Sequence, residues 1–277
     1  MKTYLVPTDY SEVADNAAKY AIALAEKEKA KIILFHVFQV PYPVAHDSYF
    51  PIISVDELEK DAKIALERYR NKLMKNSGSK IHMECAVAPG FVTESVDSYV
   101  KHHHVDLVIM GITGGSKLKE VFVGSNATSV AHNVKSNILI VPAEAKFKEV
   151  HKIGFATEFD TENEVKAQKD LKYYADLFNA QVIAINISTD TDLNTPEKAE
   201  VMQEVGKEFK DNKFFVKKIE SNNVSEEIGY YVSEKNCDWL AVVPKHHNIF
   251  GNLFGKSITK KLAYHVDVPI LALHEHT

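Results

Sequence analysis

Apolar residues along the chain gather in short, nearly continuous runs, and segments with helical periodicity lie between them. In the first part of the chain these runs are residues 2–9, 32–37, 105–110 and 137–142. Such runs are typical of strands buried on both faces, as in a parallel sheet covered by helices. After the first run, Ala17, Ala21 and Leu24 recur at helical spacing. The pattern predicts helices over residues 11–29, 54–76, 92–103 and 118–134.

The same order of apolar runs occurs a second time. Its members are residues 151–158, 182–187, 237–243 and 269–273. Alternating strands and helices in each half indicate an α/β fold. We expect two tandem, doubly wound, open parallel-sheet domains of the Rossmann-like type, each with five strands, over residues 1–146 and 147–277. In such sheets ligands bind beyond the carboxyl ends of the strands, where the strand order reverses.

Composition narrows the class of protein further. The chain has 277 residues, of which 45% are hydrophobic and 26% charged, and its formal charge is 33 − 38 = −5. These values are ordinary for a globular protein and unfavourable for binding nucleic-acid phosphates. No apolar run is long enough to cross a bilayer, and Cys85 and Cys237 offer neither a disulfide framework nor metal-ligand spacing. We therefore expect a cytoplasmic protein without nucleic-acid or membrane partners.

A group of glycines follows the run at residues 105–110. Gly111 and Gly114 are followed by Gly124 and Ser125, in the pattern G-x2-G-x9-G-S. Glycines permit a tight turn and a close approach of the backbone to a ligand. The last pair opens a predicted helical segment, whose free N–H groups suit an anion such as phosphate. The alternative is that these glycines only punctuate a loop.

The glycine pattern resembles the ATP-binding signature of the universal stress protein family. Residues 6–11 and 35–37 also resemble the first strand and turn and the second strand end of that family. The resemblance covers essentially the whole chain as a tandem pair, and it implies that the first domain binds ATP, with or without Mg²⁺.

The resemblance also implies which residues form the site. The nucleoside would lie against Pro7, Thr8, Asp9 and Val37. Ribose and phosphates would follow Met110, Gly111, Thr113 and Gly114, and phosphate oxygens would meet Gly124, Ser125, Asn126 and Ala127. Two roles stay open for Asp9, which would accept a ribose hydroxyl or cap a helix. Val37 is either a base contact or plain core.

The second half departs from the glycine pattern. Residues 243–247 lack the glycine pair, Lys256 and Ser257 stand opposite Gly124 and Ser125, and Glu158 replaces Asp9. The segment 251–257 approaches a phosphate-binding P-loop, but its spacing is one residue short and no strand directly precedes it. We expect a degenerate second domain.

Other chemistry-bearing residues favour plainer interpretations. The histidines at 102–104, 246–247, 274 and 276 raise the question of a metal, but solvated surface side chains are favoured. The loop at residues 39–54, with Tyr42, Tyr49 and Phe50, is either a lid over the nucleotide or core packing.

These features predict an ATP-binding regulatory protein of the stress response with little or no catalytic turnover. No general base or pair of metal-binding carboxylates stands out in the sequence. The alternatives are a nucleotide-free scaffold of the same fold and a slow ATPase.

The closing strand of each half indicates how the halves assemble. Residues 137–141 and 268–273 are apolar and are expected at or near sheet edges, which need to be covered. In the family that the chain resembles, the equivalent strands of two subunits pair antiparallel. We expect the two copies to pair within this chain as a pseudo-dimer, joined by the short Lys- and Glu-rich segment at 143–150. Further homodimerisation stays open.

Overall fold

The computed structural model describes residues 1–40, 54–113, 125–157, 162–188, 196–209, 214–220, 224–244 and 266–274. Strands in the first half are β1 (Thr3–Pro7), β2 (Lys31–Phe38), β3 (Met83–Pro89), β4 (Leu107–Ile112) and β5 (Ile138–Pro142). Helices between them are α1 (Glu12–Glu28), α2 (Val55–Ser77), α3 (Val92–His102) and α4 (Ser125–Asn133). All four predicted helices are present, although residues 118–124 of the last one lie outside the described residues.

The second half repeats the alternation of strands and helices. Its strands are β6 (Lys152–Ala156), β7 (Gln181–Ser188), β8 (Phe215–Glu220), β9 (Trp239–Val242) and β10 (Ile270–Ala272). Its described helices are α5 (Glu162–Phe178), α6 (Pro196–Glu208) and α7 (Val224–Glu234). The expected α/β class with parallel strands is confirmed.

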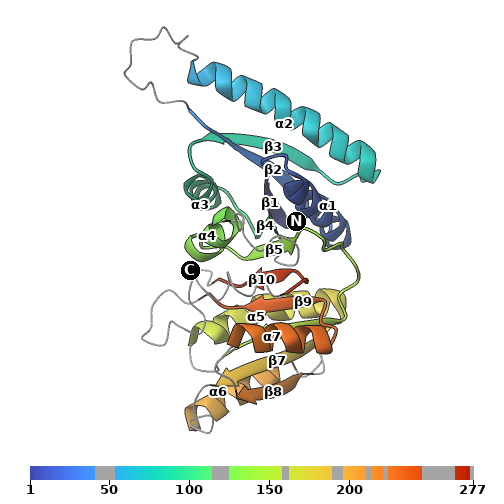
Figure 1. Ribbon diagram of the computed structural model, residues 1–277, viewed down its shortest axis with the longest axis vertical. Coiled ribbons are helices and arrows are strands. Elements are labelled where there is room, and N and C mark those ends of the chain that lie inside the picture. Colours follow the sequence, from blue (N-terminus) through green and yellow to red (C-terminus); the bar gives the residue numbers. More distant parts are fainter. Residues whose placement is uncertain are drawn as a thin grey trace.

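All ten strands form one sheet, in the order β3-β2-β1-β4-β5-β10-β9-β6-β7-β8. Figure 1 shows this sheet running through the length of the molecule. Neighbouring strands are parallel within each half, and β5 and β10 join the halves antiparallel. In this junction Ile140 lies opposite Ile270, and Leu139 opposite Leu271. The predicted antiparallel pairing of the closing strands is therefore present, and it covers an edge that would otherwise be exposed.

Helices cover both faces of the sheet. Buried side chains of α1, α2, α5 and α6 form one apolar cluster with the strands, and those of α3, α4 and α7 form a second. Alternate residues of β1 divide between them, with Tyr4 and Val6 in the first cluster and Leu5 in the second. Both clusters continue through the two halves, so the core does not stop at the junction.

Local signals explain the helix boundaries. The Ser11 side chain accepts a hydrogen bond from the Ala14 N–H at the start of α1, and Lys29 adopts a left-handed conformation at its end. Ser54 caps α2 in the same way, and Gly78 ends it with φ +66°. Serine at the first position and a left-handed residue after the last turn are the usual punctuation of a helix.

The segment that connects the halves packs into the core. Phe147 stacks edge-on against Tyr20 at 5.3 Å and also meets Phe178 of the second half. Beneath it, the buried Trp239 Nε1–H donates to Tyr20 Oη at 2.7 Å. A buried hydrogen bond of this kind contributes about 1 kcal/mol, and the surrounding ring burial contributes more. The junction at 143–150 is therefore part of the packed structure.

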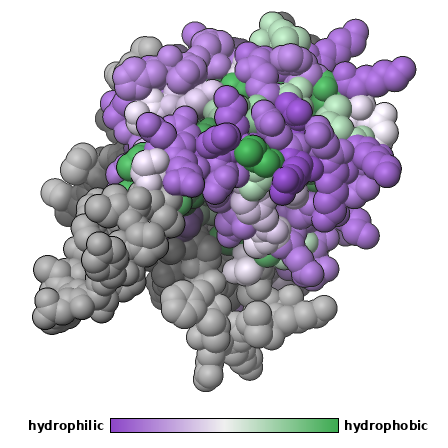
Figure 2. All heavy atoms as spheres, turned by 90° about the horizontal axis from the view of Figure 1, so that it is seen from above, coloured by the Kyte–Doolittle hydropathy of each residue, from purple (hydrophilic) through white to green (hydrophobic). Residues whose placement is uncertain are grey.

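The face of the molecule at the α2 end is mainly hydrophilic, with small apolar areas between hydrophilic side chains (Figure 2). Among the described residues, no helix combines the length and the apolar character that crossing a membrane would require.

Candidate nucleotide-binding site

A pocket of about 360 Å³ opens at the carboxyl ends of β1 and β4. These two strands are neighbours in the sheet, and the chain order runs outward from them in opposite directions. The pocket therefore lies at the point where open α/β sheets bind ligands. It is lined by Pro7, Thr8, Asp9, Ser11, Val13, Ala14, Phe35, Val37, Val92, Met110, Gly111, Thr113, Asn126 and Ala127.

Nine of the twelve residues that the resemblance implied line this pocket. They are Pro7, Thr8, Asp9, Val37, Met110, Gly111, Thr113, Asn126 and Ala127. Gly114 and Gly124 lie outside the described residues. Ser125 begins α4, but its side chain is not described.

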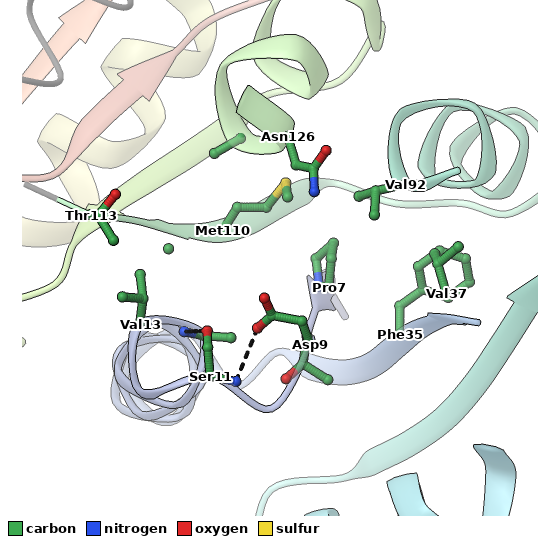
Figure 3. A pocket seen from close by; sticks show the side chains of 14 residues that line it. Pro7, Asp9, Ser11, Val13, Phe35, Val37, Val92, Met110, Thr113 and Asn126 are labelled. Carbon is green, nitrogen blue, oxygen red and sulfur yellow. Dashed lines mark hydrogen bonds between the residues drawn. The ribbon is translucent and has the colours of Figure 1, made fainter. Parts of the chain in front are cut away.

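The turn after β1 places Asp9 in front of α1. Its Oδ1 accepts the Ser11 N–H at 3.0 Å, and Figure 3 shows the carboxylate directed into the pocket. Ser11, rather than Asp9, is the residue that caps α1. Of the two roles left open for Asp9, helix capping thus falls to its neighbour. Asp9 Oδ2 makes no hydrogen bond to a described residue.

The floor of this turn is fixed by the neighbouring strand. The Thr8 N–H donates to the Phe35 carbonyl at 2.8 Å, and His36 Nδ1 donates to the Thr8 carbonyl at 2.8 Å. Thr8 Oγ1 accepts the Tyr10 N–H, which helps to hold Tyr10 in a left-handed conformation with φ 66°. These hydrogen bonds hold the carboxyl end of β1 against β2.

An apolar wall closes one side of the pocket. Phe35 and Val37 come from β2, Val92 begins α3 and Met110 comes from β4 (Figure 3). Phe35 and Val37 lie two residues apart, so they share one face of the strand. The two-residue repeat of a strand would have pointed from Val37 to Phe35, which the sequence analysis did not include in the site. It also did not include Ser11, Val13, Ala14 and Val92. Val37 is half-buried and lines the pocket rather than the closed core.

Gly111 is explained first by packing. A Cβ on this residue would lie 2.5 Å from the Val13 backbone oxygen and 2.7 Å from Val13 Cγ1. Only glycine lets β4 and the first turn of α1 approach so closely. The sequence interpretation attributed this glycine to contact with a ligand; its nearest neighbour is α1, although it also lines the pocket.

Ionisable groups are scarce in the pocket. Asp9 is the one residue with an ionisable side chain among its described lining residues. Beside the pocket, Tyr10 lies between the rings of His36 and Tyr69. Burial, with a smaller contribution from Cys85, raises the pKa of Tyr10 to about 12, so its hydroxyl is neutral near pH 7. The first turn of α4, at Asn126 and Ala127, brings backbone N–H groups to the pocket, and such groups suit an anion.

Three of the described residues in the histidine runs have hydrogen-bond partners. His102 and His103 donate from Nδ1 to the carbonyls of Ser98 and Tyr99 at the end of α3. His274 corrects the expectation of solvated surface histidines, because it is only 6% exposed. Within the described ranges no group of acidic, histidine and cysteine side chains could hold a metal ion. Residues 41–53, 246–247 and 251–257, with the proposed lid and the P-loop-like segment, lie outside the description.

Comparisons with known proteins define the class. The model of the universal stress protein family matches residues 1–142. A universal stress protein of Methanocaldococcus jannaschii is 29% identical over 147 residues, which cover 52% of this chain and 84% of that protein. One from Synechocystis sp. is 30% identical over 146 residues, which cover 50% of this chain and 95% of that protein.

A similar arrangement of both halves occurs in a solved structure. This is the crystal structure of a universal stress protein from Archaeoglobus fulgidus. The match covers 99% of the present chain and 98% of the Archaeoglobus fulgidus chain. The TM-score is 0.74 and the sequence identity 20%, so this likeness concerns the fold. The fold, with a pocket at the strand ends, is that of an α/β protein with a parallel sheet in each half. The chain belongs to the universal stress protein family.

Proposed function

We propose that the first half binds ATP, with or without Mg²⁺, in the pocket between β1 and β4 and acts as a regulatory protein of the stress response. The observation that carries this proposal is the meeting of nine implied nucleotide-binding residues around one cavity. These residues come from segments far apart in the sequence, so their convergence does not follow from the motif alone.

The chemistry of the pocket suits the parts of a nucleotide. The apolar wall of Phe35, Val37 and Val92 offers a surface for a base. Asp9 Oδ2 is available as an acceptor for a ribose hydroxyl. The first turn of α4, at Asn126 and Ala127, offers N–H groups and the positive end of the helix dipole to phosphate.

Little turnover is expected. Hydrolysis needs a positioned base, and phosphoryl transfer usually needs several charged groups around the phosphates. The described lining residues supply Asp9 alone, at the end of β1. We propose a binding and signalling role, with a slow ATPase as the alternative.

We extend the proposal to the whole chain. Residues 1–146 and 147–277 would be two domains that form an intramolecular pseudo-dimer through β5 and β10, with the second domain degenerate as a nucleotide site. The unpaired Cys85 and Cys237 favour a reducing compartment, and we place the protein in the cytoplasm.

A charge substitution at the proposed phosphate end tests ATP binding. Asn126 is exposed at the start of α4, so Asn126→Asp adds a negative charge where helices tolerate one. Repulsion of the phosphates should weaken ATP binding about tenfold, which corresponds to about 1.4 kcal/mol. Titration calorimetry on the full chain measures the affinity and the number of sites, for which we expect one.

Asn71→Asp is the matched control, because it makes the same change on exposed α2, outside the pocket lining. Its ATP affinity should equal that of the unmodified protein. Equal affinity in Asn126→Asp would refute the placement of the phosphates. Absence of ATP binding by the unmodified protein would favour the nucleotide-free scaffold.

A further inference from the structure

His274, which follows β10, reaches from the second half into the first. It is buried, and its Nε2 lies 2.8 Å from the Ala131 carbonyl oxygen of α4. A carbonyl only accepts, so Nε2 carries the proton and donates. The contact joins residues 143 positions apart.

The accepting carbonyl belongs to the last turn of α4. The helix ends at Asn133, so Ala131 is one of its last four residues, whose carbonyls lack partners within a helix. The imidazole of His274 therefore caps α4 at its carboxyl end. A helix of nine residues is marginal by itself and depends on such tertiary support.

A second contact fixes the orientation of this cap. Asn137 Oδ1, just before β5, accepts the His274 N–H at 3.0 Å. Its Nδ2 donates to Asp170 Oδ2 of α5 at 2.8 Å, which defines which end of the amide faces His274. The cap is thus held by α5 and by the strand junction together.

The opposite end of the same helix forms the pocket. Asn126 and Ala127 in its first turn line the cavity. Between the ends, Ala127, Val130 and Ala131 pack in the apolar cluster that contains Ile138 and Ala272. A change at the carboxyl end is therefore expected to alter how firmly the first turn is held.

The position equivalent to His274 in the first half cannot make the same contact. Ile138 begins β5 as Ile270 begins β10, so Pro142 occupies the place in the first half that His274 occupies in the second. Proline has neither a backbone N–H nor a side-chain donor. The first half therefore has no equivalent cap to offer from this position.

We propose that His274 is a positioning residue, through which the second half holds α4 and thereby sets the nucleotide affinity of the first half. The inference rests on the proposed binding of ATP. It assigns the degenerate half a function: it is an internal support for the site that lies in the other half.

The test compares two substitutions in the full chain with a matched control. His274→Ala removes the cap, whereas His274→Gln retains an N–H donor at similar reach. Asn186→Ala removes another buried bond to a backbone carbonyl in the second half, the one from Asn186 Nδ2 to the Thr157 oxygen, away from α4. Amide hydrogen exchange across 125–137, without nucleotide, reports the stability of α4, and calorimetry with ATP reports the affinity.

For His274→Ala we expect the rate of amide hydrogen exchange in α4 to rise about fivefold. The dissociation constant for ATP should also rise about fivefold, the usual effect of losing one such hydrogen bond. His274→Gln should restore both to within about twofold, and Asn186→Ala should leave both unchanged. Unchanged exchange in His274→Ala overturns the cap, and faster exchange with unchanged affinity overturns the coupling. An equal loss in Asn186→Ala would reduce the effect to general destabilisation and also overturn it. If the unmodified protein binds no ATP, the proposed function fails and the exchange result alone decides the cap.

Discussion

The two halves use the same device where their central strands begin. Asp106, just before β4, accepts the Thr3 N–H at 2.8 Å and so ties β4 to the start of β1. In the second half, Asp238 stands just before β9 and accepts the Lys152 N–H at 3.0 Å, which ties β9 to β6. Both carboxylates also pair with a lysine, Lys2 in the first half and Lys148 in the second.

The strand ends of the halves are also similar, with one change of donor. The Thr8 carbonyl accepts from His36 Nδ1, and the Thr157 carbonyl accepts from Asn186 Nδ2 at 2.9 Å. Different side chains thus donate to the equivalent backbone carbonyl in each half. A buried carbonyl without a hydrogen-bond donor would destabilise the fold.

The halves differ at the place where the pocket forms. Gly111 in β4 corresponds to Val243, which follows β9 and is 6% exposed. The glycine allows α1 to lie against β4, whereas a valine there would overlap the Val13 backbone. Among the described residues, these hydrogen bonds are therefore repeated, whereas the glycine that lines the pocket is replaced by valine. The same fold can thus carry different residues at the position where one half forms a pocket.

Separating the halves should have the largest effect. Expressed alone, residues 1–146 lose the β10 strand that pairs with β5, and an apolar edge with unpaired N–H and C=O groups is exposed. We expect the fragment to dimerise through β5 or to precipitate. Light scattering after size exclusion, with the full chain at equal concentration as reference, measures this. A stable monomeric fragment would contradict the role given to the β5–β10 junction.

Much of this comparison is visible in the sequence, because it depends on local patterns. Apolar runs predicted four of the five strands in each half, whereas β3 and β8 matched none of them. Ser11 and Gly78 lie next to the ends of α1 and α2. Contacts between distant segments were not visible. Nothing local to Gly111 indicates Val13 as its neighbour, and nothing local to His274 indicates the Ala131 carbonyl. Proximity of this kind is set by packing in three dimensions.

The second largest effect is expected from Gly111→Ala. Its new Cβ would lie 2.5 Å from the Val13 oxygen, so α1 must shift. Overpacking of this kind costs about 2 kcal/mol. The movement should also weaken ATP binding, because Ser11, Val13 and Ala14 line the pocket. Urea unfolding and calorimetry measure the two effects.

Gly206→Ala is the control for that substitution. Its Cβ would have no neighbour closer than 3.8 Å, and it lies within α6. Alanine is the better helix former, so this variant should be neutral or up to about 1 kcal/mol more stable. If Gly111→Ala behaves like Gly206→Ala, the close approach of α1 and β4 does not explain the difference between the halves.

The smallest effect is expected from removing the charge of Asp238, and this effect on the free energy of unfolding should depend on pH. Burial by itself would raise the pKa of Asp238, but Lys148 and the N–H groups of His151 and Lys152 hold this pKa below its usual value. A lowered pKa in the folded state stabilises the fold above the unfolded value, near 4, and this stability is lost as the pH falls through the folded value. Asp238→Asn should therefore cost about 1 kcal/mol at pH 7, and the deficit should begin to shrink near pH 4 and narrow further as the pH falls and the native carboxylate is protonated. Urea unfolding from pH 7 to pH 3 measures this, with the exposed Asp61→Asn as a control that should show no deficit. If the two carboxylates stabilise their halves equally, Asp106→Asn should lower the free energy of unfolding at pH 7 by a similar amount. A loss of stability in only one of the two variants would mean that the halves share the geometry of this contact but not its contribution to stability.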